Sequence, residues 1–262
     1  MSTKGCLIVF EGIEGSGKTV VSKNLQKYLL TKEYKVLWTR EPTTSRIGVL
    51  IEEILERKTE VAEEAIPLLF AADRADHTKY VIIPAINKGR IVVSDRYIHS
   101  SLAYQKSGME KAFRRKWLEE INRYSIKPDL IIFLDIVPEE GLRRIGKWPR
   151  IQDDKFFEDV EIQKRIRDAY YDVLNLNKPL TSLFKREHFT NSLLSKLKAL
   201  SATGGGVVVC IDASLPQEDV QDTTNKVVQR FLKSKEIQKQ KKELEPKDFL
   251  SIFFQKFPSA SR

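Results

Sequence analysis

The stretch Gly12-Ile13-Glu14-Gly15-Ser16-Gly17-Lys18-Thr19 decides the fold, because it is a complete G-x-x-x-x-G-K-T motif. It directly follows an apolar run, residues 6–10, and opens a stretch of helical periodicity, residues 19–30. A strand, a glycine loop and a helix in this order form a cradle for phosphates, since backbone N–H groups and the helix N-terminus attract anions. The motif therefore predicts binding of ATP or GTP. The residues expected to contact ATP are Gly12, Glu14, Gly15, Ser16, Gly17, Lys18, Thr19 and Val20.

Four further apolar runs predict the rest of a sheet. They cover residues 35–39, 91–94, 130–134 and 207–211. Each run is continuous rather than alternating, which is typical of a parallel strand buried on both faces. Segments of helical length separate the runs, so the sequence predicts an α/β fold with a doubly wound, five-stranded parallel sheet. The predicted helices cover residues 19–30, 46–57, 62–87, 111–125, 138–146, 157–176 and 190–200.

Composition narrows the class of protein. Of 262 residues, 41% are hydrophobic, which is enough to bury a core and excludes disorder throughout the chain. Both cysteines, Cys6 and Cys210, lie in apolar runs and are interpreted as buried, reduced thiols of a cytoplasmic protein. We expect no membrane span, because no apolar run approaches the required length of about 18 residues.

Charge and turn residues divide the chain into two parts. Residues 1–232 are predicted to form one domain, and residues 233–262 a basic C-terminal tail in which the helical pattern ends. The net charge is +9, and the tail contains eight lysines and arginines but only four acidic residues. A basic balance favours anionic partners such as nucleotides or nucleic acid.

Two short segments indicate how a second substrate binds. Asp95 ends an apolar strand, so we expect it to hold Mg²⁺ together with the Thr19 hydroxyl, while Arg96 faces an anionic group on the acceptor. Phe70 and Arg74 lie four residues apart on one helical face. An aromatic ring beside a guanidinium suits a planar base, since the ring stacks and the guanidinium donates to a carbonyl.

Four sequence segments, taken with the glycine motif, resemble the thymidylate kinase family from about residue 5 to residue 171. The resemblance implies a nucleoside-monophosphate-kinase fold with a helical lid, and the reaction ATP + dTMP → ADP + dTDP. Because the acceptor phosphate is already a competent nucleophile, catalysis would consist of positioning and charge neutralisation by Lys18, Asp95, Arg96 and a lid arginine, Arg150. The four segments are residues 39–42, 68–77, 95–105 and 128–135.

The resemblance also implies roles for residues that bind the acceptor. Glu14 would lie near the sugar 3′-hydroxyl, and Tyr104 would crowd a 2′-hydroxyl and so prefer deoxyribose. Phe70 would stack on thymine, Arg74 would bond its carbonyl, and Arg96 would bind the monophosphate. The complete set expected to bind dTMP is Glu14, Arg40, Phe70, Arg74, Arg96, Ser101, Tyr104 and Gln105.

The sequence departs from the family pattern at several positions. Thr43 and Thr44 replace a common Gly-Gly pair, and Glu52 stands where an arginine often grips the acceptor phosphate, so Arg40 or Arg46 would have to replace it. Gly15 leaves no arginine in the loop, so a lid cation would assist transfer. A helical insertion covers about residues 177–203. The candidate lid cations are Arg144, Lys147 and Arg150.

Other functions remain open from the sequence. One is a kinase for another nucleotide or for a nucleoside, and another is a non-catalytic accessory protein that binds nucleotide. The family resemblance implies a homodimer. The tail also resembles short peptides that dock on replication sliding clamps, with Lys247 in the position of a leading glutamine and Leu250, Phe253 and Phe254 as an apolar plug.

Overall fold

A computed structural model of the chain describes residues 5–108, 115–146, 159–176 and 206–244. The chain divides into two compact units, residues 1–225 and 226–262, and the division falls inside helix α10 (Gln217–Leu244). The described residues of the second unit, 226–244, are the remainder of that helix. Among the described residues, no helix is both long and apolar enough to cross a membrane.

The first unit is built on five parallel strands in the order β2-β3-β1-β4-β5, which confirms the predicted sheet. The three central strands are buried along their whole length, as expected for continuous apolar runs covered on both faces. Asp95 and Arg40 are paired in register at the carboxyl ends of β3 and β2. The strands are β1 (Cys6–Glu11), β2 (Val36–Arg40), β3 (Ile91–Asp95), β4 (Leu130–Asp135) and β5 (Val207–Asp212).

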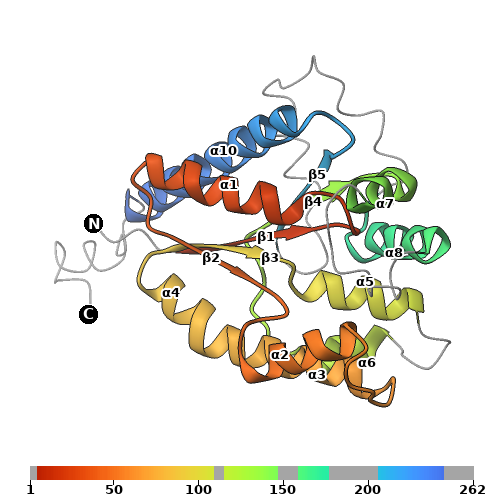
Figure 1. The fold of residues 1–262 in the computed structure, drawn as a ribbon. Coiled ribbons are helices and arrows are strands. Elements are labelled where there is room, and N and C mark those ends of the chain that lie inside the picture. The colour runs from red at the N-terminus through yellow and green to blue at the C-terminus, as the bar shows by residue number, and fades with distance from the viewer. Residues whose placement is uncertain (1–4, 109–114, 147–158, 177–205, 245–262) are drawn as a thin grey trace, which may run out of the picture. The chain divides into compact units, whose positions relative to one another are not determined.

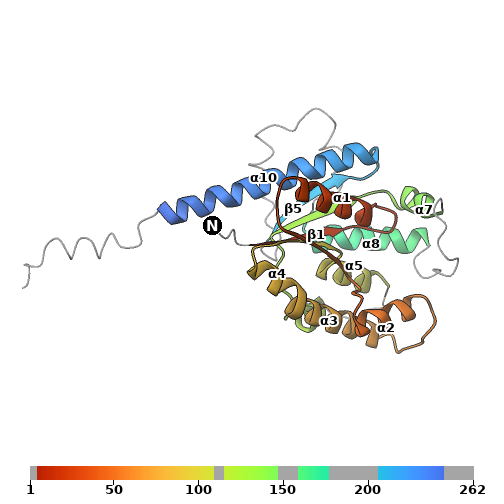
Figure 2. The same cartoon turned by 60° about the vertical axis from the view of Figure 1, so that its left-hand side comes forward.

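Helices cover both faces of this sheet, so the fold is α/β and doubly wound. Figures 1 and 2 show α1 on one face and α4, α5 and α8 on the other. One core cluster packs β1 and β3 against the helices of the second face. It consists of Leu7, Val9, Ile82, Ala85, Val92 and Tyr97. The helices of the first unit before α10 are α1 (Lys18–Thr31), α2 (Arg46–Leu55), α3 (Ala65–His77), α4 (Ile83–Asn87), α5 (Ile98–Gly108), α6 (Arg115–Ile121), α7 (Pro138–Gly146) and α8 (Val160–Val173), with a π-helical turn, η1 (Thr78–Ile82), between α3 and α4.

The segment predicted as one helix, residues 62–87, is divided by the π turn η1. Pro84 lies in the first turn of α4 and has no N–H to donate to the carbonyl four residues earlier. A wider π turn just before a proline accommodates the missing hydrogen bond without ending the helical path. The predicted helical segment is therefore present over residues 65–87, with one π turn inside it.

Helix α10 continues to Leu244, although we expected the helical pattern to end at Leu232. Residues 233–244 consist mainly of lysine, glutamate and glutamine, which lack an apolar stripe but have high intrinsic helix propensity. Propensity therefore extends the helix where periodicity gave no signal. The predicted insertion at 177–203, the predicted helix at 190–200 and the tail from residue 245 lie outside the described residues.

Candidate active site at the carboxyl ends of the strands

The glycine motif forms a loop between β1 and α1, as predicted. Gly17 caps α1 in the left-handed conformation, with φ 87°. Gly15 has φ 72°, and a Cβ atom added there would lie 2.0 Å from the carbonyl oxygen of Gly141 in α7. Only glycine fits this close approach, so the helix α7 is the physical reason that the loop cannot carry an arginine at position 15.

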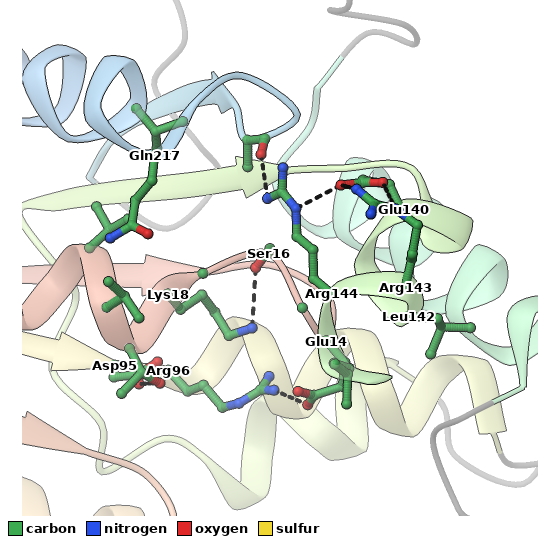
Figure 3. Close-up of a pocket in the computed structure, with 18 of the residues that line it drawn as sticks. Glu14, Ser16, Lys18, Asp95, Arg96, Glu140, Leu142, Arg143, Arg144 and Gln217 are labelled. Carbon is green, nitrogen blue, oxygen red and sulfur yellow. Dashed lines mark hydrogen bonds and ion pairs between the residues drawn. The ribbon is translucent and has the colours of Figure 1, made fainter. Parts of the chain in front are cut away.

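Lys18 extends along this loop, as Figure 3 shows. Its Nζ donates to the Ile13 carbonyl at 2.7 Å and to the Ser16 hydroxyl at 3.3 Å. The residue is only 5% exposed, and its burial lowers the pKa of the ammonium to about 8, helped by the positive charge of Arg96. An anion placed in the loop would replace the lost hydration of this charge.

We expect ATP binding to take up a proton at about pH 8.5, because most free Lys18 is then neutral and the nucleotide phosphates favour its charged form. Calorimetric titrations in two buffers of different ionisation enthalpy measure this uptake. At about pH 7 the uptake should disappear, since Lys18 is already protonated there. Equal binding enthalpies in the two buffers at the higher pH would show that Lys18 does not change its charge.

Asp95 and Thr19 lie together beside the loop. The Thr19 hydroxyl donates to Asp95 Oδ2 at 2.5 Å, whereas Asp95 Oδ1 is buried and has no hydrogen-bond partner among the described residues. A buried carboxylate oxygen with no partner is costly unless a cation or water satisfies it, so this pair fits Mg²⁺. The described residues contain no group of three or more histidine, cysteine or acidic side chains that could hold a metal. A single carboxylate and a hydroxyl suit Mg²⁺, which usually takes its other ligands from water and substrate phosphates.

Arg96 follows Asp95 in the left-handed conformation, with φ 68°. Its N–H donates to the Phe10 carbonyl at 2.9 Å, and its carbonyl accepts from the Ser94 hydroxyl at 2.8 Å. These two bonds hold the unfavourable conformation and direct the guanidinium toward Glu14, with which it forms an ion pair (Figure 3). The guanidinium also lies 5.0 Å from the centre of the Tyr104 ring. Arg96 thus lines the same cavity as Lys18.

No sequence pattern singles out Glu11, which is fully buried at the end of β1. It accepts the Tyr97 N–H at 3.0 Å, the Ser100 hydroxyl at 2.6 Å and the Tyr170 hydroxyl at 3.0 Å. Burial by itself would raise the pKa of Glu11, but His99 and the bond from Ser100 lower it below its ordinary value. An ionised Glu11 therefore ties β1 to α5 and α8 just behind Arg96. The only signal in the sequence is an acidic residue at the end of an apolar run.

A cavity of about 1500 Å³ opens over the loop. Arg40 and Glu52 line one side, where they form an ion pair at 3.1 Å. Arg40 and Arg46 were the two candidates to replace the arginine that the family often carries at position 52. Of these two, Arg40 lines the cavity and forms an ion pair with Glu52. The opposite side is lined by α7, by the loop after β5 and by the start of α10, including Arg143, Arg144, Ser214 and Gln217.

Arg144 joins these two elements of the opposite side. Its guanidinium donates to Glu140 at 2.9 Å, to the Ala213 carbonyl at 2.8 Å and to the Ser214 carbonyl at 3.4 Å (Figure 3). Among the three candidate lid cations, Arg144 is thus engaged with the loop after β5. Lys147 and Arg150 lie outside the described residues.

The residues predicted to bind the base and sugar are not part of the cavity lining. Phe70 is half-buried on α3. Arg74 is buried, and its guanidinium donates a hydrogen bond to the Ser101 hydroxyl at 2.8 Å. Tyr104 donates to Glu14 at 3.2 Å, the carboxylate that also pairs with Arg96. None of these four predicted base and sugar contacts, Phe70, Arg74, Ser101 and Tyr104, lines the cavity over the loop. The side chain of Gln105 is not described.

Comparison with known proteins identifies the family. The family model for thymidylate kinase matches residues 10–184, which is more than half of the chain. The chain belongs to the thymidylate kinase family. A probable thymidylate kinase of Pyrococcus horikoshii is 39% identical over 73% of this chain and 90% of its own length. A probable thymidylate kinase of Methanocaldococcus jannaschii is 42% identical (63% and 80%), and a thymidylate kinase of Clostridium novyi is 36% identical (70% and 96%).

This member of the thymidylate kinase family fixes the loop after β2 with side chains. Asp73 accepts the Thr43 N–H at 2.9 Å, the Thr43 hydroxyl at 2.5 Å and the Ser45 hydroxyl at 3.1 Å. Ser45 in turn accepts the Gly48 N–H at 3.2 Å and caps α2. The Thr43 and Ser45 hydroxyls thus hold a loop that glycine would leave freer, which gives a structural role to Thr43.

Proposed function

We propose that the protein transfers the γ-phosphoryl group of ATP to the phosphate of dTMP, giving ADP and dTDP. The observation that carries this proposal is the meeting of Lys18, Asp95 and Arg96 at the carboxyl ends of β1 and β3, in a chain whose relatives are named thymidylate kinases. Incubation with ATP, Mg²⁺ and dTMP should yield dTDP, identified by ion-exchange chromatography. Formation of ADP without dTDP would contradict the proposal.

The proposed reaction needs no nucleophilic side chain. An oxygen of the dTMP phosphate attacks the γ-phosphorus in line, and the bond from that phosphorus to the bridging oxygen of ADP breaks. Lys18 neutralises charge on the β- and γ-phosphates, and Arg96 holds the attacking phosphate. Thr19 and Asp95 would hold Mg²⁺, which supplies further positive charge to the phosphates when bound. A lid cation, Arg150 in our proposal, would complete the charge around the transferred group.

The acceptor base is proposed to lie against α3. Phe70 is half-buried there and one helical turn before Arg74, so the ring and guanidinium occupy one side of the helix. Glu14 and Tyr104 would contact the deoxyribose, and Arg40 the phosphate. Ser101 and Gln105 would contact the edge of the base. This arrangement favours a kinase that acts on a thymine nucleotide. It argues against a kinase for another acceptor and against a non-catalytic nucleotide-binding protein.

Replacement of Phe70 by alanine should raise the KM for dTMP about 5- to 150-fold, since stacking of a base on an aromatic ring is worth ~1–3 kcal/mol. The KM for ATP should change little, because Phe70 does not line the cavity over the loop. Leu68→Ala, at an exposed position of the same helix, is the matched control. An unchanged KM for dTMP would assign Phe70 to packing alone.

We propose that the active protein is a homodimer. Apolar side chains are exposed on η1 and α4, among them Tyr80, Val81 and Ile83. Such surfaces are common at protein interfaces. Sedimentation at micromolar concentration tests the proposal, and a monomer there would contradict it.

Two further proposals concern the setting of the protein. Cys6 and Cys210 are buried free thiols, which suits the reducing cytoplasm that we propose as its location.

We also propose that Lys247, Leu250, Phe253 and Phe254 dock on a replication sliding clamp, although these residues lie outside the described part of the chain. Titration of the full chain, and of a Phe253→Ala variant, against the clamp tests this docking, and equal binding would refute it.

A further inference from the structure

All three guanidinium nitrogens of Arg74 donate hydrogen bonds to neighbouring residues. A guanidinium has five N–H donors, and four of those of Arg74 are used in hydrogen bonds. Nε donates to Glu41 at 2.8 Å, and Nη1 donates to Asn122 at 2.5 Å. Nη2 donates to the Ser101 hydroxyl at 2.8 Å and to the Tyr97 carbonyl at 3.4 Å. The residue is only 1% exposed. Among the described residues, the one N–H left over is therefore the second hydrogen of Nη1.

Asn122 sets the direction of that remaining N–H. A guanidinium is planar, so the two hydrogens of Nη1 lie in one plane at a fixed angle to each other. Once Asn122 Oδ1 accepts one of them, the other can point only in a single direction. Glu41, at the far end of the plane, prevents the group from rotating.

Asn122 is itself held in one orientation. It follows α6 and is only 4% exposed, and its Nδ2 donates to the Leu118 carbonyl at 2.8 Å. If the amide turned over, Nδ2 would face the donors of Arg74 and Oδ1 would face a carbonyl. The amide oxygen is therefore committed to Arg74.

We infer that Asn122 is a specificity-determining positioning residue, which aims the one available N–H of Arg74 at a carbonyl of the nucleobase. This inference rests on the proposed function, in which Arg74 donates to thymine. Asn122 acts through Arg74 and does not contact the substrate. Glu41, Ser101 and the Tyr97 carbonyl bond the other two nitrogens, whereas Asn122 is the described residue that bonds Nη1, the nitrogen proposed to meet the base.

The inference is tested with Asn122→Leu, which keeps the size of the side chain but removes the acceptor. We expect the KM for dTMP to rise ~10-fold, because a mispositioned donor forfeits about one hydrogen bond, while kcat and the KM for ATP change less than about 2-fold. In 5-methyl-dCMP an amino group replaces one of the two thymine carbonyls. The preference of the enzyme for dTMP over this analogue should fall ~10-fold in the variant.

A double-mutant cycle separates positioning from simple packing. If Asn122 acts through Arg74, adding Asn122→Leu to Arg74→Ala should change the KM for dTMP by less than about 2-fold. A purely structural role would give additive effects in the cycle. Asn122→Ser, whose hydroxyl is too short to reach Nη1, provides a smaller substitution if the leucine variant does not fold, and should act in the same direction.

The outcomes distinguish two kinds of failure. A wild-type protein that forms no dTDP would overturn the proposed function and this inference with it. A wild-type protein that forms dTDP, combined with additive effects in the cycle or an unchanged preference over 5-methyl-dCMP, would overturn the inference alone. An unchanged KM for dTMP in Arg74→Ala would also overturn it, since Asn122 would then have no base contact to aim.

Discussion

Replacement of Lys18 by alanine is expected to lower kcat/KM for dTMP phosphorylation by at least about a thousand-fold. The lysine Nζ lies inside the phosphate loop, bonded to the Ile13 carbonyl and the Ser16 hydroxyl, where its charge acts on the phosphates of ATP. Initial rates with saturating ATP and varied dTMP measure the loss.

The fold should survive this substitution. Lys18 is buried and its pKa is lowered to about 8, so its charge is poorly solvated and its removal does not weaken the folded protein. Thermal unfolding should therefore remain cooperative, with a midpoint equal to or above that of the wild type. Lys23→Ala, at an exposed position of the same helix, is the matched control and should keep its activity. Activity near the wild-type level in Lys18→Ala would remove the residue from the mechanism.

The second large effect is expected for Arg96→Ala, with a loss of about 10²- to 10³-fold in kcat/KM. The left-handed backbone at position 96 is no more strained with alanine than with arginine, because both residues carry a Cβ atom. Glu14 loses its ion-pair partner but is partly accessible to water, so the stability should fall only slightly. The defect should therefore appear in catalysis and not in thermal unfolding.

A matched control is Arg123→Ala, since Arg123 is exposed and pairs only with neighbouring surface groups in the described structure. Its kinetics should match the wild type. Arg96→Lys should be intermediate, because lysine keeps the charge but not the planar fork of donors. Loss of cooperative unfolding in Arg96→Ala would show instead that the residue serves the fold.

The strands and the phosphate loop could be predicted because their signals are local. The central strands β1 and β4 are apolar up to their last residue, and the loop is fixed by glycines next to one strand and one helix. The same reasoning located Lys18, Thr19, Asp95 and Arg96, since the carboxyl ends of parallel strands meet at one edge of a sheet. All four lie at the cavity in the structure.

The buried polar contacts could not be predicted, because they join residues far apart in the chain. Glu11 and Tyr170 are separated by 159 positions, and Arg74 and Asn122 by 48. Glutamate and asparagine are usually exposed, so a sequence predicts them at the surface. Only the fold shows that Glu11 and Asn122 are buried and hydrogen-bonded. The sequence pattern singled out Arg74, but its confinement by Glu41, Ser101 and Asn122 had no sequence signal.

The central claim, phosphoryl transfer from ATP to dTMP, is tested most directly by ADP release measured with a panel of acceptors. The wild-type protein with ATP and Mg²⁺ is supplied in turn with dTMP, dUMP, CMP, thymidine or no acceptor. We predict rapid ADP release with dTMP, slower release with dUMP, and little with CMP, thymidine or no acceptor. Equal release with and without dTMP, or faster release with CMP or thymidine, would contradict the account.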